Sequence, residues 1–566
     1  MISGALNDVP WYDQEIAHPN PHPGLPGSGA DELGPFAHYA DHRASGHSVE
    51  GLRMKQNVDQ RRGLAVHFTL LVAALLSAAP AHAQDPLLAG AAKVDITDYE
   101  AGPANDPMFA RALVLKHGET TLVLVAVDAV AIGEIGPIKN DYLPTVRNRL
   151  EKELHIPPNN LLVNASHCHG LVCRDVADRT IQAITQASKN LVPVTVGVGS
   201  GHEDRISENR RLKLKSGREA DVRHAYALPP DEEVAEVGPI DPQIGLIRFS
   251  GEDGRTVAVL YNFACHPIMG VPGAANTADI TGFSSRVIED NLNEGKDGPG
   301  PIALFLQGCG GDINPVDYKA VDHPRHAEPL GNTLGLSTLK GLRTIEAKPD
   351  PRLTVLSETL TLPRADQEER IAAQEAELRQ LLQSLKGTSL NLKTFLPLAV
   401  KYNLAEEFPS YASHRYLHDA TLGRSDFAKL DEENRRNLQA YLQNILTMEK
   451  LTRVQTNLAL LRKHQASLIA SGKRTIDVEV MAVRIGEAVL VTFPGELTVR
   501  IGLGIKKTSP HPRTFVAGYT NGYIYYAPTA EQLKNVGGAQ EDSDCILAPE
   551  WQALFEAKVA DMLKRL

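Results

Sequence analysis

The chain has 566 residues, 42% of them hydrophobic, which is enough to bury a large core in one large domain or in two to three ordinary ones. Its 69 acidic and 58 basic residues give a formal net charge of -11, so the composition disfavours nucleic acid and anionic lipid as partners. Five cysteines are a sparse and odd set, which excludes a disulfide framework.

The amino-terminal region divides into two segments before the folded protein. Residues 1–53 are rich in Pro, Gly, His and Asp without an apolar period, so we expect a disordered or non-native leader there. Residues 54–83 combine basic residues, an apolar run and a small-residue cleavage pattern, which predicts a signal peptide with translation from Met54 and cleavage before Gln84. The alternative is a membrane anchor, but the apolar run is shorter than a membrane span needs. We therefore expect an exported protein, periplasmic or secreted, with no transmembrane segment in the mature chain.

From residue 92 the pattern becomes that of a sheet protein. Apolar β-branched runs at 94–97, 112–115 and 121–127 predict buried strands, and a helical pattern at 144–154 precedes another strand at 161–163. A strand, a helix and a strand in succession imply a right-handed crossover and a parallel pair.

The strand at 161–163 leads into His167-Cys168-His169-Gly170. Residues two apart in an extended chain point to the same face, so the two imidazoles are expected to converge. Converging neutral imidazoles are what a zinc ion binds, although a hydrogen-bonded surface pair is the alternative. Cys168 would point to the other face, and we interpret it as a small buried residue.

A basic segment follows a predicted helix at 175–190 and a predicted strand at 194–198. It spans 207–215 and contains Arg210 and Arg211. Either guanidinium can hold a substrate carbonyl or carboxylate through two hydrogen bonds, and the alternative is a solvated run of charge.

Two further strand ends supply candidate site residues. A predicted hairpin of strands at 245–249 and 256–262 ends at His266, which precedes a proline and is therefore biased to extended geometry, as an outward-facing ligand would be; a structural histidine is the alternative. A strand at 302–306 leads into a glycine-rich loop in which the backbone amides of Gly310 and Gly311 can hold an oxyanion, or which can simply form a tight turn.

The last third of the chain has two parts. Residues 365–470 carry apolar residues at helical spacing, which predicts a helical insertion whose stretch after Gly387 can form a wall over the active site. A hairpin of strands at 478–485 and 488–493 then ends at Glu496, a metal ligand or a helix cap, and residues 518–526 contain four tyrosines, one of which can reach a metal or an oxyanion. These elements together predict a mixed α/β fold with a largely parallel central sheet, flanking helices and a helical insertion.

Five short segments in this order resemble the neutral, non-lysosomal ceramidases, in their amino-terminal catalytic domain, over residues 92–566. The segments are His167-Cys168-His169-Gly170, Asn262-Phe263-Ala264-Cys265-His266-Pro267, Gly311-Asp312-Ile313-Asn314-Pro315, Pro494-Gly495-Glu496, and Gly518-Tyr519-Thr520-Asn521 with Tyr526.

The resemblance implies a zinc site. Its ligands would be His167, His266, Glu496 and Tyr526, and His169 beside the metal would handle protons. Asn314 stands where the family has its functional serine; it cannot act as a nucleophile, but its amide can donate to an oxyanion. A second tyrosine of the family's site has no counterpart around 538–540.

We therefore expect an exported zinc-dependent hydrolase of linear amides, in which zinc-bound water attacks a carbonyl. His169 would manage protons, Asn314 with the Gly310 and Gly311 amides would hold the oxyanion, and Arg210 would bind the substrate. The substrate would be a small-molecule or lipid amide, ceramide-like by resemblance. The alternatives are a metal-dependent phosphoesterase, whose His-x-His usually comes late in the chain, and a non-catalytic exported binding protein. The oligomeric state stays open.

Overall fold

The computed structural model describes residues 85–566 except 223–227, 294–299, 319, 321, 406–413 and 536–537. The predicted leader and signal peptide lie outside the described residues. Asp85–Leu566 forms one compact unit. Within the described part of this unit, no helix is both long and apolar enough to cross a membrane.

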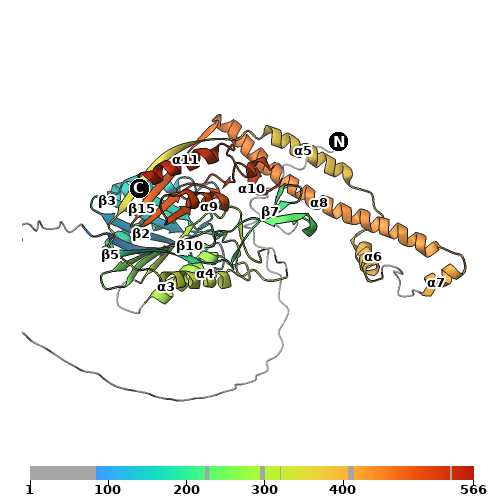
Figure 1. The fold of residues 1–566 in the computed structure, drawn as a ribbon, viewed down its shortest axis with the longest axis horizontal. Helices are drawn as coiled ribbons and strands as arrows, with labels where there is room; N and C mark the ends of the chain where they lie inside the picture. Colours follow the sequence, from blue (N-terminus) through green and yellow to red (C-terminus); the bar gives the residue numbers. More distant parts are fainter. Residues whose placement is uncertain are drawn as a thin grey trace, which may run out of the picture. The chain divides into compact units, whose positions relative to one another are not determined.

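Strands between Leu88 and Gln307 form an eight-stranded sheet in the order β12-β11-β10-β5-β1-β2-β3-β4 (Figure 1). Only the β3–β4 and β11–β12 pairs are parallel, and the other five are antiparallel. The predicted mixed α/β class is confirmed, but the expectation of a largely parallel sheet is wrong, because many neighbours are joined by hairpins and only two pairs by helical crossovers. The strands are β1 (Leu88–Asp95), β2 (Phe109–His117), β3 (Thr120–Val127), β4 (Leu161–Ala165), β5 (Val192–His202), β10 (Gln243–Gly251), β11 (Thr256–Phe263) and β12 (Ile302–Gln307).

A second sheet has the order β14-β15-β16-β18 and packs against the first. Its strands are β14 (Leu353–Pro363), β15 (Thr475–Ile485), β16 (Ala488–Thr492) and β18 (Thr514–Ala517). Alternate residues of a strand point to opposite faces. Leu113 and Leu115 therefore join an inner core with Met481 and Val483 of the second sheet, whereas Val114 faces the helical side.

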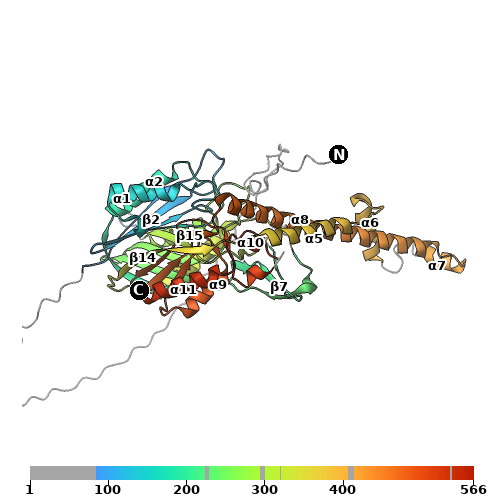
Figure 2. The same cartoon turned by 90° about the horizontal axis from the view of Figure 1, so that it is seen from above.

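Helices cover the outer faces of both sheets (Figures 1 and 2). Four lie against the larger sheet: α1 (Tyr142–Leu154), α2 (Val176–Lys189), α3 (Asp279–Leu292) and α4 (Ala327–Leu342). Against the smaller sheet lie α9 (Val499–Thr508) and α11 (Trp551–Lys564), and Trp551 and Phe555 of α11 pack on Phe493. The two sheets are thus enclosed between two helical layers.

Short strands carry Asn314, Glu496 and Tyr526, which are three of the predicted site residues. The β13–β6 pair places Asn314 opposite Glu208, and the parallel β17–β19 pair places Glu496 beside Tyr526. A separate three-stranded sheet has the order β8-β7-β9. The elements are β6 (Ser207–Asn209), β7 (Arg211–Leu214), β8 (Glu219–Asp221), β9 (Val234–Val237), β13 (Ile313–Pro315), β17 (Glu496–Leu497), β19 (Tyr526–Ala527) and α10 (Gln540–Ser543), with short 3-10 turns at Pro158–Asn160, Asp231–Glu233 and Gln532–Lys534.

The helices described between Glu368 and Ser471 form a helical arm, made of α5 (Glu368–Ser384), α6 (Leu392–Leu404), α7 (His414–Thr421) and α8 (Asp426–Ser471). Helix α8 contacts α10 near its carboxyl end and α5, α6 and α7 elsewhere. Figures 1 and 2 both show α6 and α7 at the end of α8 that points away from the sheets. The expectation that the stretch after Gly387 forms a wall over the active site is therefore wrong, because α6 packs on α8 instead.

Candidate metal centre

The carboxyl ends of strands from both sheets meet at one place, and buried asparagines hold them there. Asn164 on β4 accepts from the backbone N–H of Gln307 at 2.8 Å and donates through its side chain to the carbonyl of Gly518 at 2.7 Å. These bonds join the ends of β4, β12 and β18. They explain how motifs far apart in the sequence come together.

The imidazoles of His167 and His266 are buried and face each other, with their Nε2 atoms 2.9 Å apart. The Nδ1 of His167 lies 2.7 Å from the Val130 carbonyl, and the Nδ1 of His266 lies 2.9 Å from the Gly310 carbonyl. A carbonyl only accepts hydrogen bonds, so each Nδ1 carries the hydrogen and each Nε2 presents a lone pair. Burial, His167 and Arg210 keep the pKa of His266 well below its usual value, so its ring is neutral.

A carboxylate completes this group of acceptors. Glu496 Oε2 lies 3.6 Å from Nε2 of His167 and 3.9 Å from Nε2 of His266. Three lone-pair donors that face one another without a hydrogen between them repel unless a cation lies among them. Two atoms bound to one tetrahedral zinc ion lie about 3.3 Å apart, and the three observed separations bracket that value. The residues present therefore fit a divalent metal ion.

Two tyrosines hold the Glu496 carboxylate in place. The Tyr519 hydroxyl donates to Oε2 at 3.0 Å, and the Tyr523 hydroxyl donates to Oε1. Burial, and then the Glu496 charge, raise the pKa of Tyr519 well above its usual value, so it remains a donor. Such outer partners fix the orientation of a ligand and its charge.

His169 is the exposed member of the predicted site. Its ring lies 5.4 Å from that of His167, between centroids, and the ligand nitrogens of His167, His169 and His266 all lie within 4.8 Å of one another. His169 can therefore act as a further ligand or as a proton-handling group open to solvent.

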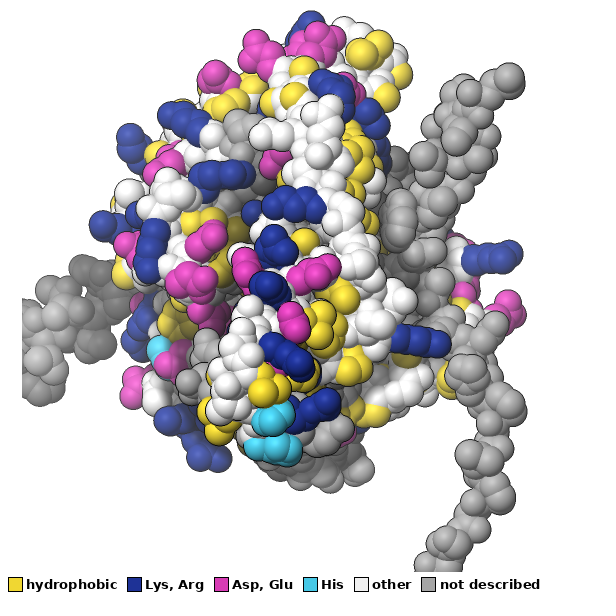
Figure 3. All heavy atoms as spheres, turned by 90° about the vertical axis from the view of Figure 1, so that its right-hand side faces the viewer, with side chains coloured by type: hydrophobic (Ala, Val, Ile, Leu, Met, Phe, Trp, Pro, Cys, Tyr) yellow, Lys and Arg dark blue, Asp and Glu magenta, His cyan; other side chains and the backbone are white. Residues whose placement is uncertain are grey.

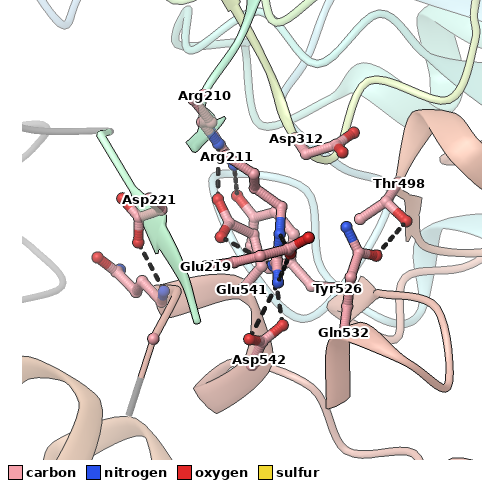
Figure 4. A network of polar contacts seen from close by, with 12 residues as sticks. Arg210, Arg211, Glu219, Asp221, Asp312, Thr498, Tyr526, Gln532, Glu541 and Asp542 are labelled. Atoms are coloured by element: carbon pink, nitrogen blue, oxygen red, sulfur yellow. Dashed lines mark hydrogen bonds and ion pairs between the residues drawn. The ribbon is translucent and has the colours of Figure 1, made fainter. Parts of the chain in front are cut away.

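Arg210 lies buried at the centre of a polar network (Figure 4). Its Nε pairs with Glu541 at 2.6 Å, and its two Nη atoms donate to the Asn314 Oδ1, the Gly311 carbonyl and the Tyr526 hydroxyl, both side-chain distances being 3.2 Å. The hydroxyl of Tyr526, the fourth predicted ligand, thus accepts a hydrogen bond from the Arg210 guanidinium, and Tyr526 lies beside Glu496.

The alternative of a solvated charge run at 207–215 is wrong for both arginines of the pair. Arg211 is as buried as its neighbour and makes two hydrogen bonds to Asp542 on α10 (Figure 4). Burying these charges is tolerated because each meets an acidic residue of α10.

The glycine-rich loop lies against the other site segments. A Cβ on Gly310 would meet the Cys265 carbonyl oxygen at 2.5 Å, and one on Gly311 would meet that of Glu496 at 2.5 Å. Glycine is therefore needed for the backbones to approach. The N–H of Gly311 donates to the Leu497 carbonyl at 3.0 Å, so this amide already has an acceptor and does not point at an oxyanion.

Unusual backbone conformations occur at the site. The strand β4 ends at Ala165, and His167 has a φ of 67°, so the expectation that 167–169 is extended is wrong. Tyr519, at φ 52°, and Tyr525, at φ 63°, are also left-handed. Strain of this kind persists where the surroundings fix the chain, as they do at functional sites.

Sequence reasoning missed several partners of the site. It did not single out Tyr519 or Tyr523 as partners of Glu496, nor Glu541 as the partner of Arg210; the density of tyrosines at 518–526 was the one available signal. The five cysteines, all within the described residues, are free, and four of them are buried, as expected for small core residues.

No protein-family model matches the sequence, and no curated protein matches it. Solved structures that share its fold include the neutral ceramidase from Pseudomonas aeruginosa, at 17% identity and a TM-score of 0.52, where the match covers 85% of this chain and 75% of that chain. A ceramidase complexed with C2 matches at 18% identity and a TM-score of 0.52, over 85% of this chain and 76% of that chain. The expected resemblance is confirmed at the level of the fold.

Proposed function

We propose that this ceramidase-fold chain is a zinc-dependent hydrolase of amide bonds that acts on N-acyl lipids of the ceramide type. The observation that carries the proposal is the convergence of His167 Nε2, His266 Nε2 and Glu496 Oε2, three buried acceptors within 3.9 Å of one another. Tyr526, the register partner of Glu496, supplies the fourth ligand of the proposal. Amide hydrolysis is the chemistry of the neutral ceramidases that share the fold.

A zinc ion bound by these residues would polarise a substrate carbonyl and lower the pKa of a water molecule toward about 7. The chain's own residues prepare that chemistry. The Val130 and Gly310 carbonyls hold both imidazoles in the tautomer that offers Nε2, and Tyr519 and Tyr523 hold the carboxylate of Glu496.

Asn314 and Arg210 are proposed to stabilise the carbonyl oxygen of the substrate. Arg210 donates a hydrogen bond to the Oδ1 of Asn314, and this bond orients the amide. The Nδ2 of Asn314 is then a buried donor that has no partner among the described residues. A buried, fixed donor stabilises negative charge that develops on a carbonyl oxygen. Asn314 therefore serves as an oxyanion donor in the place of the family's serine, with Arg210 as its positioning residue.

His169 is proposed to carry the proton. It lies beside the buried nitrogens and is exposed, so it can pass a proton between the site and solvent when the amine leaves. Export of the protein, with removal of residues 1–83, belongs to the same proposal and rests on the signal-like pattern of the sequence.

Metal analysis of purified full-length protein tests the site. We expect about one zinc ion per chain, and His266→Ala should retain less than about a tenth of it, because one of the facing donors is lost. His202→Ala removes an exposed histidine and serves as the matched control. Full metal content in His266→Ala would contradict the ligand set.

A substrate screen tests the reaction. Wild-type protein should release fatty acid from N-acyl lipids, and a chelator should abolish release until zinc is restored. A protein that binds such lipids without releasing acid, and holds no zinc, would be the non-catalytic binding protein instead.

A further inference from the structure

The two ends of the helical arm differ in their surroundings. The outer end, where α6 and α7 lie, presents hydrophobic, basic and acidic side chains mixed together on the face seen in Figure 3, so this face favours no single class of partner. At the inner end, all but one of the buried residues of α8 lie between Thr447 and Leu468, and the helix contacts α10 (Figure 1). The inner end is therefore where the arm can act on the rest of the protein.

His464 is a buried histidine of this inner end that the proposed chemistry does not use. Its Nε2 lies 2.7 Å from Oδ1 of Asp544, and the two side chains are 3% and 0% exposed. A carboxylate only accepts hydrogen bonds, so Nε2 carries the hydrogen. The pair fixes the place of Asp544 on α8, because breaking it leaves a buried carboxylate without one of its hydrogen bonds.

The main chain at Asp544 meets the strand β19. The Asp544 carbonyl accepts from the backbone N–H of Tyr526 at 3.2 Å, and Cys545 forms an antiparallel bridge with Tyr525. From the other side, Gln367 at the start of α5 donates through its side chain to the Cys545 carbonyl at 3.2 Å. This short segment thus joins the base of the arm to the strand that carries Tyr526.

One peptide group of that strand is held from both of its polar atoms. It links Tyr525 to Tyr526: its carbonyl accepts from the backbone N–H of Glu496 at 2.9 Å, and its N–H donates to Asp544. Tyr525 has a φ of 63°, a conformation that residues other than glycine keep only where the surroundings fix the chain. The hydrogen bonds to Glu496 and Asp544 fix it here.

We propose that His464 is a positioning residue of the metal centre. By holding Asp544 it fixes the peptide group of Tyr526, and this directs the phenol of Tyr526 to the metal. The inference rests on the proposed function, in which Tyr526 is a ligand. Partners that orient a ligand change metal affinity by about 10- to 100-fold when they are lost.

Zinc affinity of full-length protein, measured by competition with a chromophoric chelator, tests the role of His464. His464→Ala should bind zinc about tenfold more weakly, because Tyr526 is no longer held. His464→Gln should restore most of the affinity, because its amide can donate to the same carboxylate although it lacks the ring. The matched control is Tyr402→Phe, which removes a buried hydrogen bond farther along the arm and should bind zinc as wild type does.

Hydrogen exchange of the metal-free protein separates this inference from the proposed function. The amide of Tyr526 should exchange at least about tenfold faster in His464→Ala than in wild type or His464→Gln, with the amides of α2 as an internal reference. If His464→Ala does not fold, His464→Asn makes the same comparison, because its shorter amide does not reach the carboxylate.

Wild-type protein that binds no zinc would refute the proposed function, and exchange would still decide whether His464 fixes Tyr526. The inference is overturned if the Tyr526 amide exchanges equally fast in wild type and His464→Ala, if His464→Ala binds zinc as tightly as a zinc-binding wild type, or if His464→Gln restores neither property.

Discussion

At the scale of single residues, Asn314 is the position where this chain departs from the pattern it resembles. The Oδ1 of its amide is held by Arg210, and Arg210 is in turn held by Glu541. The side chain is fully buried, so the direction of its free N–H is set by neighbours rather than by solvent. A fixed donor costs no reorganisation when charge develops on the substrate.

Asn314→Asp has nearly the same shape and replaces this donor by an acceptor. We expect kcat to fall by about 10²- to 10³-fold with KM little changed, because the lost interaction is made only in the transition state. Steady-state kinetics on an N-acyl substrate measures the effect, and metal content should stay at the wild-type level. Asn444→Asp, the same change on α8, is the control; equal kinetics for the two variants would exclude the proposed role of Asn314.

At the scale of elements, one carboxylate joins two helices to a third through hydrogen bonds. Asp431 of α8 accepts from the Tyr402 hydroxyl of α6 at 2.5 Å and from the Tyr416 hydroxyl of α7 at 2.7 Å. Burial and then the hydrogen bond to Asp431 raise the pKa of Tyr416, so the tyrosine remains the donor. The positions of α6 and α7 on α8 therefore depend on Asp431.

Asp431→Ala should loosen α6 and α7 without disturbing the sheets. Loss of two hydrogen bonds to a charged acceptor is worth about 3 kcal/mol, so amides of Leu392–Leu404 and His414–Thr421 should exchange with solvent at least about tenfold faster. Hydrogen exchange followed by mass spectrometry checks this, with the amides of α11 as an internal reference. Glu433→Ala on the same helix should leave exchange unchanged, and faster exchange in α11 as well would point to global destabilisation instead.

At the scale of the whole molecule, a buried carboxyl group links stability to pH. Asp279 begins α3 and accepts from the backbone N–H groups of Gly270 and Ile280. Burial raises its pKa to about 7 in spite of these bonds, whereas in the unfolded chain an aspartate has a pKa of about 3.9. The folded protein therefore binds this proton more strongly than the unfolded chain does.

The contribution of Asp279 to stability should be complete below pH about 4 and be lost as the pH rises through about 7. Urea unfolding of wild-type protein and of Asp279→Asn, at several pH values between about 5 and 8, measures it. The advantage of wild type over the variant should shrink as the pH rises, since asparagine does not titrate. Asp561→Asn, at an exposed position on α11, is the control. A difference between wild type and Asp279→Asn that does not change with pH would show that Asp279 is already ionised at pH 5.

Much of the local structure could be read from the sequence. The strands at 112–115 and 121–127 and the hairpin ending at His266 were predicted because continuous apolar runs and turns that contain glycine are local signals. The order of the motifs at His167, His266 and Glu496 indicated the ceramidase fold. Arg210 was singled out, but its burial was not foreseen, because a basic segment has the same composition whether it is solvated or paired.

Only the tertiary structure decided how these pieces meet. The balance of antiparallel over parallel pairs depends on which strands become neighbours, and α6 lies on α8 rather than over the site because the apolar face of α8 is there to receive it. Arg210 and Glu541 are 331 residues apart, and His167 and His266 are 99 apart. The sequence by itself therefore determined the strands, helices and chemical groups, which follow from local periodicity and residue type; their convergence on one site was decided by the packing of two sheets, which no local pattern records.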